Sequence, residues 1–192
     1  MNVFYLDPDP KTCAEMHCDK HTVKMIIEYA QLMSTAHRVL DGEEYFDKTA
    51  NGRKIRRWRM KDPKYESGLM LACHINHPSN VWVRANHLNY KWLYEMWCYL
   101  LDEYTYRYGK VHACARLRDD LAKLPEKIPV GLRETEPPPA MPDYCKVPGD
   151  SITSYQTYYI NEKVRFARWT KREMPVWYQN GINTNNANLQ LL

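Results

Sequence analysis

The sequence contains no long apolar run, since none of its hydrophobic stretches approaches the roughly 18 residues that a membrane-spanning helix needs. Residues 1–7 also lack the charged start and the apolar core of a secretory signal peptide. We therefore expect a cytoplasmic protein without a membrane partner.

Cysteine pairs are absent as well. The six cysteines are scattered along the chain, and no two of them form a Cys-x-x-Cys motif. This spacing argues against a four-thiolate zinc site, and without a signal peptide we expect reduced thiols. One metal alternative stays open, because Cys13, His17 and His21 would follow one another at four-residue spacing on a helix. We expect no metal and no cofactor.

The sequence is poor in phenylalanine, and neither charge sign is in large excess. The chain has 27 Lys and Arg against 23 Asp and Glu, a net charge of +4, which permits a polyanionic partner without requiring one. Only 3 Phe accompany 15 Tyr and 6 Trp. Such aromatic side chains suit polar pockets and base stacking, and they equally suit half-buried positions.

The hydrophobic pattern predicts a mainly α fold with three to four long helices and extended loops. With 192 residues and 44% apolar residues, we expect one helical domain over 1–179 and a flexible tail over 180–192. Helices are predicted at 10–40, 77–108, 111–123 and 151–171, and residues 3–6 suit a short strand or an extended arm. Seven of the twelve prolines fall within 125–148, which predicts a loop across the surface.

The first candidate site is a face of the predicted helix 10–40. His17, Lys20, His21 and Lys24 are spaced by three or four residues and would share one face. Two imidazoles and two ammonium groups suit an anion such as phosphate, and histidine can transfer protons near neutral pH. We expect His17, Lys20 and His21 to be catalytic and Lys24 to bind phosphate. The alternative is a solvated polar face.

Two further groups belong to the helix predicted at 77–108. His74 and His77 precede its first turn, where free N–H groups attract anions, although His77 can equally be a simple cap. Asn86, Asn89, Glu103 and Arg107 fall on its apolar side, where polar groups must be paired or line a pocket. We expect Glu103 to be catalytic and the others to bind substrate. The alternative is a structural Glu103–Arg107 ion pair.

A basic run occupies residues 53–61, with six basic residues, no acidic one and a tryptophan in its middle. Positive charge combined with an aromatic ring is typical of nucleic-acid contacts, although such runs are often merely solvated. The predicted contact residues are Arg56, Arg57, Trp58 and Arg59.

Several of these residues resemble the family of phage endonuclease V, the pyrimidine-dimer DNA glycosylase. His17 with the charged cluster behind it is similar to the first helix of that family. His77-Pro78, Asp102-Glu103-Tyr104, Arg107, Gly109 and His112 resemble its second helix. The resemblance covers residues 1–112, and the whole chain also resembles uncharacterised proteins of tailed phages. It implies that the protein acts in the cytoplasm of a phage host.

The resemblance also implies an amine nucleophile. In that family the nucleophile is the α-amino group exposed when the initiator Met is removed. Residue 2 is Asn here, which normally keeps Met1 in place. The amine would then come from Met1 or Lys20. The family's catalytic Glu has no match in the stretch of Lys20, His21 and Lys24.

We therefore expect a phage-type enzyme of the DNA glycosylase/lyase kind, whose partner is DNA or a small nucleotide. The alternative is a protein that binds or hydrolyses a small cyclic nucleotide serving as an immune signal of the host. A third class, a structural or inhibitory binding protein, stays open, as does assembly into a homo-oligomer.

Overall fold

The computed structural model describes residues 1–189 and is mainly α, as the sequence predicts. Within these residues it contains eight α-helices, so the expected three to four long helices understate the count. Four helices are short: α1 (Pro10–Met16), α3 (Pro63–Gly68), α4 (Pro78–Val83) and α6 (Arg118–Leu121). The longer ones are α2 (Asp19–Asp41), α5 (His87–Tyr108), α7 (Ser151–Glu162) and α8 (Val176–Leu189).

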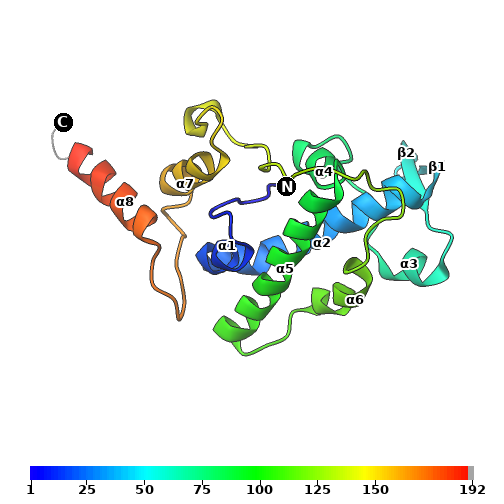
Figure 1. Ribbon diagram of the computed structural model, residues 1–192, viewed down its shortest axis with the longest axis horizontal. Helices are drawn as coiled ribbons and strands as arrows, with labels where there is room; N and C mark the ends of the chain where they lie inside the picture. The colour runs from blue at the N-terminus through cyan, green and yellow to red at the C-terminus, as the bar shows by residue number, and fades with distance from the viewer. Residues whose placement is uncertain (190–192) are drawn as a thin grey trace.

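Helices α2 and α5 cross at the centre of the molecule (Figure 1). Their contact is apolar, with Met33, Leu93 and Met96 fully buried. The indole N–H of the buried Trp97 in α5 donates to the carbonyl of Ile26 in α2, at 2.9 Å. The two helices together form most of the core on which the other elements are placed.

The predicted helix 10–40 is broken in two at residues 17–18. Helix α1 begins as expected, because the Asp9 side chain accepts from the N–H of Thr12 at 2.8 Å and Pro10 follows the cap. It ends at Met16, and α2 begins after the extended Cys18. Not every large apolar residue of α2 faces the core, since Val23 and Ile27 are 39% and 45% exposed.

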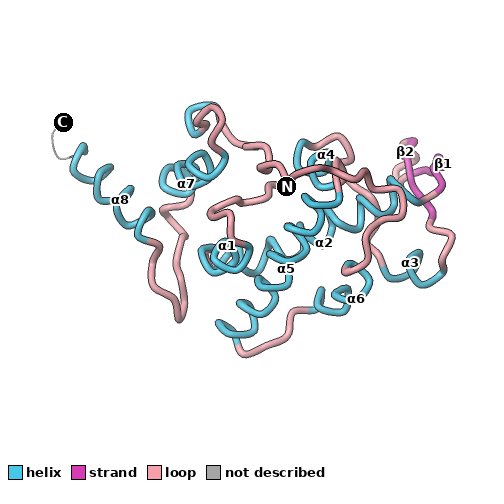
Figure 2. Tube along the Cα trace, in the orientation of Figure 1, coloured by secondary structure: helices cyan, strands magenta, loops and turns pink. Residues whose placement is uncertain are grey.

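The segment after α2 forms a hairpin that the sequence pattern did not predict. Strand β1 (Glu43–Lys48) pairs antiparallel with β2 (Lys54–Arg59), and the hairpin lies at the opposite end of the molecule from α8 (Figure 2). The buried Arg38 of α2 holds it in place. Its five N–H groups donate to the carbonyls of Trp58, Glu66, Leu69 and Met70 and to the Glu66 carboxylate.

The N-terminal arm packs against this body, and the proline-rich stretch runs along it. Residues 3–6 run as a buried extended arm without strand pairing, so they form the expected arm and not a strand. The proline-rich stretch is a long connection along the surface, with short 3₁₀ helices at Ala113–Leu117 before it and Asp143–Cys145 within it (Figure 2). Among the described residues no helix is long and apolar enough to span a bilayer.

The predicted flexible tail is helical through Leu189, within α8. A methyl group on Gly181 would come within 2.2 Å of Ile160 in α7, which shows how closely the start of this tail packs. Tyr178, just before it, is buried. Residues 190–192 lie outside the described part of the chain.

Candidate active site

His17 is not on the surface of a helix. It follows the last residue of α1, and its ring is fully buried. Its Nδ1 lies 2.7 Å from the carbonyl of Cys13, and its Nε2 lies 2.8 Å from the hydroxyl of Tyr29. A carbonyl can only accept, so Nδ1 carries the proton and Nε2 accepts from Tyr29. Burial lowers the pKa of His17 to about 4. This histidine is a neutral structural residue, which corrects its predicted catalytic role.

His21 and Lys20 also separate from the predicted face. His21 is buried against Phe4, with the ring centroids 4.2 Å apart, and its Nδ1 bonds the hydroxyl of Tyr159. Burial lowers the pKa of His21 well below its ordinary value. Lys20 is exposed, and its ammonium lies 4.7 Å from the ring centroid of Phe166. The break between α1 and α2 therefore disperses the expected His/Lys face.

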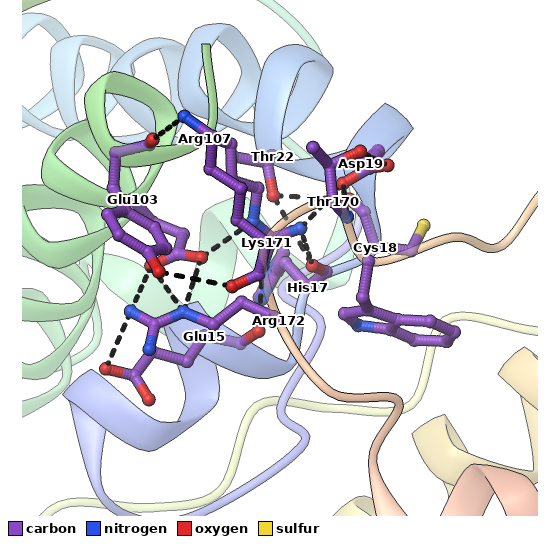
Figure 3. Close-up of polar contacts among 12 residues, drawn as sticks. Glu15, His17, Cys18, Asp19, Thr22, Glu103, Arg107, Thr170, Lys171 and Arg172 are labelled. Atoms are coloured by element: carbon purple, nitrogen blue, oxygen red, sulfur yellow. Dashed lines mark hydrogen bonds and ion pairs between the residues drawn. The ribbon is translucent and has the colours of Figure 1, made fainter. Parts of the chain in front are cut away.

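Glu103 and Arg107 form the structural ion pair that the sequence left as the alternative. Arg107 Nε lies 2.6 Å from Glu103 Oε1, and both side chains are buried. The same guanidinium donates to the carbonyls of Glu15 and His17 and to the carboxylate of Asp19 (Figure 3). These bonds satisfy the carbonyl groups that the helix break leaves open.

Arg172 completes this cluster, because its Nη2 lies 2.8 Å from Glu103 Oε2 (Figure 3). Burial by itself raises the pKa of Glu103, but the hydrogen bonds from Arg172 and Arg107 outweigh it and hold the pKa below its usual range. Glu103 is therefore an ionised anchor between α5 and the C-terminal segment. It also lines a cavity of about 330 Å³ together with Glu15 and Arg172, and its role as a catalytic acid or base stays a prediction.

Asn86 and Asn89 also make structural contacts instead of lining a pocket. The Asn86 side chain caps α5 by accepting from the N–H groups of Leu88 and Asn89. The Asn89 amide donates to Trp82 and bonds both the backbone and the hydroxyl of Thr135. Their predicted role in substrate binding is replaced by fastening the proline-rich connection to α5.

Two of the predicted segments do come together. The hairpin and the loop before α4 enclose an open cavity of about 480 Å³, lined by Ile55, Arg56, Trp58 and residues 72–77. His74 has a left-handed backbone with φ of 47°, a conformation that is uncommon outside glycine and in which asparagine, aspartate and histidine are enriched. The buried Asn80 fixes this conformation by donating to the carbonyls of Cys73 and His74, each at 2.9 Å.

The predicted DNA-contact residues divide between the two faces of the hairpin. Because side chains alternate along a strand, Arg56 and Trp58, which both line the cavity, share one face, and Arg57 and Arg59 share the other. Arg59 stacks on Tyr45, with its guanidinium carbon 4.8 Å from the ring centroid. A single nucleic-acid strand on one face cannot contact all four.

The α-amino group of Met1 lies close to Cys73 and His77 of the cavity wall, because its positive charge acts to lower the pKa of both side chains. Its nitrogen is 3.8 Å from Oε2 of Glu28 in α2, and the two side chains are only 8% and 18% exposed. Lys24 binds the other carboxylate oxygen, Oε1, at 3.1 Å. The hydroxyl of Ser79 donates to the Met1 carbonyl at 3.4 Å, so the buried arm delivers the amine to the start of α4 (Figure 1).

The charges of Met1 and Glu28 act on His77 in the predicted histidine loop. Burial lowers the pKa of His77, the Met1 ammonium and His74 lower it further, and Glu28 opposes them. A neutral His77 agrees with its cap, in which Nδ1 accepts from the N–H of Ser79 at 3.2 Å. The candidate active site therefore consists of Met1, Lys24, Glu28, His74 and His77, with Arg56 and Trp58 as the facing wall.

The metal site that the sequence left as an alternative does not form among the described residues. Within the described part of the chain no group of three or more His, Cys, Asp or Glu side chains could hold a metal ion, Cys13, His17 and His21 included.

Comparison with known proteins yields no relative: no family model, no curated protein and no solved structure matches the chain.

Glu28 is the residue that sequence reasoning missed. It follows Lys24 by four residues on the same helix, the usual spacing of a surface ion pair, and nothing in that pattern points to a reactive group. Its partner lies 27 positions away along the chain. Only the path of residues 3–6 brings the amine to it.

Proposed function

We propose that the protein is a DNA glycosylase/lyase-like enzyme whose nucleophile is the α-amino group of Met1. The observation that carries the proposal is the 3.8 Å separation between this nitrogen and the Glu28 carboxylate, beside a cavity with a basic and aromatic wall. Terminal α-amino groups as a class lose their proton nearer neutrality than lysine ammonium groups do, which suits them to nucleophilic attack.

The chemistry follows from the placement of the two groups. The free amine attacks C1′ of the target nucleotide, the N-glycosidic bond breaks, and the base leaves with the bonding electron pair and takes a proton from water. Glu28 accepts the proton released by the amine and can return it to the ring oxygen as the sugar opens to an imine. Lys24 holds the Glu28 carboxylate in place through its 3.1 Å contact. His74, His77 and Arg56 would face the flanking phosphates.

Borohydride trapping tests the proposal. The protein is mixed with a duplex that contains one abasic site, reduced, and the covalent adduct is mapped by mass spectrometry. We expect the adduct on Met1, its loss when a Gly-Ser extension precedes Met1, and full trapping by Lys20→Ala. An adduct on Lys20, or no adduct at all, contradicts the proposal. No adduct together with a thermal shift by free cyclic nucleotides favours the alternative of a nucleotide-binding protein.

A further inference from the structure

The β1–β2 hairpin has two faces of different chemistry. Cross-strand pairing places Glu44 opposite Trp58, Phe46 opposite Arg56, and Lys48 opposite Lys54. These six residues form one face, which we call the cationic face, with three positive charges and one negative charge. The other face pairs Glu43 with Arg59, Tyr45 with Arg57 and Asp47 with Ile55, so that its charges cancel.

The positive charges of the cationic face are only partly neutralised by acidic residues, and its aromatic ring is largely exposed. Lys48 and Lys54 stand directly opposite each other, an arrangement that destabilises an antiparallel pair unless an anion lies between the charges. Phe46 is 61% exposed although Lys54 covers part of its ring, with Nζ 3.7 Å from the centroid. The acidic Glu44 neutralises only Arg56, at 3.6 Å.

The cationic face also leads directly to the candidate active site. Its Arg56 and Trp58 line the cavity whose other wall is the loop 72–77. Trp58 is anchored from behind, because its carbonyl accepts from the buried Arg38 at 2.9 Å. The hairpin is therefore held at a defined position beside the cavity.

We propose that the cationic face binds a DNA strand, with Lys48, Lys54 and Arg56 on successive phosphates and a base stacked on Phe46. Alternating cations and an exposed aromatic ring are the recognition chemistry of a polynucleotide backbone with unstacked bases. An acidic protein would be attracted by the charges but would leave the ring without a planar partner. The direction of the strand, toward Met1, rests on the proposed function, whereas binding to the face is measurable by itself.

The test compares two variants that each remove two positive charges from the same strand. Lys54→Ala/Arg56→Ala alters the cationic face, and Arg57→Ala/Arg59→Ala alters the opposite face. Binding of an undamaged, fluorescein-labelled 20-nucleotide single strand and its duplex is measured by anisotropy between 50 and 200 mM KCl. We expect the first variant to weaken binding of the single strand by about tenfold and to lower the salt slope by about 0.7 for each lost phosphate contact. The second should change affinity less than about threefold.

Phe46→Ala and Tyr45→Ala, a matched pair on opposite faces, test the stacked base. We expect Phe46→Ala to weaken single-strand binding at least about fivefold, the low end for one stacked base, and to leave heparin binding unchanged. Tyr45→Ala should change neither. Equal losses in the two double variants, no loss in either, or equal loss of DNA and heparin binding by Phe46→Ala would each overturn the proposal. Duplex binding as strong as that of the single strand, with no effect of Phe46→Ala, would also overturn it.

These outcomes are separable from those for the amine. Undamaged DNA offers no abasic sugar, so its binding needs no reaction at Met1. If borohydride trapping on Met1 is observed but the variants of the cationic face bind DNA normally, only the proposal for the cationic face is overturned. If the variants of the cationic face lose DNA affinity but no covalent adduct forms, the proposal for the cationic face stands and the proposed reaction is overturned.

Discussion

The α-amino nitrogen of Met1 lies 3.8 Å from the carboxylate of Glu28, in a covered position between α2 and the start of α4. The pair is joined to the body of the protein from both sides. The arm before α1 is held by the Tyr29 hydroxyl, which accepts from the N–H of Phe4 at 3.1 Å. Glu28 is held by Lys24 from the same helix.

Glu28→Gln should lower the rate of strand cleavage at an abasic site by about 10²–10⁴-fold, because the amide cannot accept the proton of the amine. Single-turnover cleavage of a labelled duplex measures this rate. Glu15→Gln on α1 is the matched control, since Glu15 pairs with Arg172 at 3.2 Å and not with Met1. A rate unchanged by Glu28→Gln would remove the carboxylate from the mechanism.

Glu103→Ala should lower the free energy of unfolding by roughly 3–5 kcal/mol, because it removes the buried carboxylate that pairs with both Arg107 and Arg172. The neighbouring Asp102→Ala is the control. Asp102 pairs with Arg118 at 2.6 Å, but both side chains are substantially exposed, so its loss should cost less than about 1 kcal/mol. Urea unfolding followed by tryptophan fluorescence measures both, and similar losses would contradict the assignment of Glu103 as a buried anchor.

The protein should lose stability as the pH falls from about 6.5 to 4. Burial lowers the pKa of His17 and of His37 to about 4, so the unfolded chain binds their protons first. Their contribution is complete above pH 6.5 and is lost on acidification, by roughly 2 kcal/mol for each between pH 7 and 5. Urea midpoints across this range measure the slope.

His17→Asn should reduce the dependence of the unfolding free energy on pH by the contribution of one of the two histidines. Tyr29→Phe is the control: it removes the hydroxyl bonded to His17 and lowers stability at both pH values, yet it leaves the titrating ring in place. A slope identical in His17→Asn and the unaltered protein would show that this ring does not resist protonation.

Gly42→Ala should destabilise the junction of α2 and β1 by about 1–3 kcal/mol. A methyl group there would lie 2.5 Å from the Arg38 carbonyl oxygen and 3.2 Å from that of Arg59, both backbone atoms that cannot swing aside. Gly68→Ala meets only the Asp120 carboxylate at 3.5 Å and should be neutral or slightly stabilising. Thermal unfolding compares the two variants, and equal melting temperatures would contradict the close approach at Gly42.

The helical character of the chain was predictable because local signals act within a few residues. Asp9 and Pro10 mark the start of α1, and Gly109, with φ of 66°, ends α5 as expected from its sequence position. The basic run at 53–61 was also evident. Its folding into a two-stranded hairpin was not, because the position of the hairpin depends on a hydrogen bond from Arg38 of the preceding helix to the Trp58 carbonyl.

Local sequence signals were enough to predict the helical class, the caps and the residue types that could carry chemistry. Which of these residues meet depends on the packing of distant segments. It turned His17 inward because the Tyr29 hydroxyl and the Cys13 carbonyl can satisfy both ring nitrogens, and it engaged Glu103 with two arginines. It brought Met1 to Glu28, since burial of the apolar residues 3–6 fixes the path of the arm. Such pairings depend on long-range packing, which no local spacing encodes.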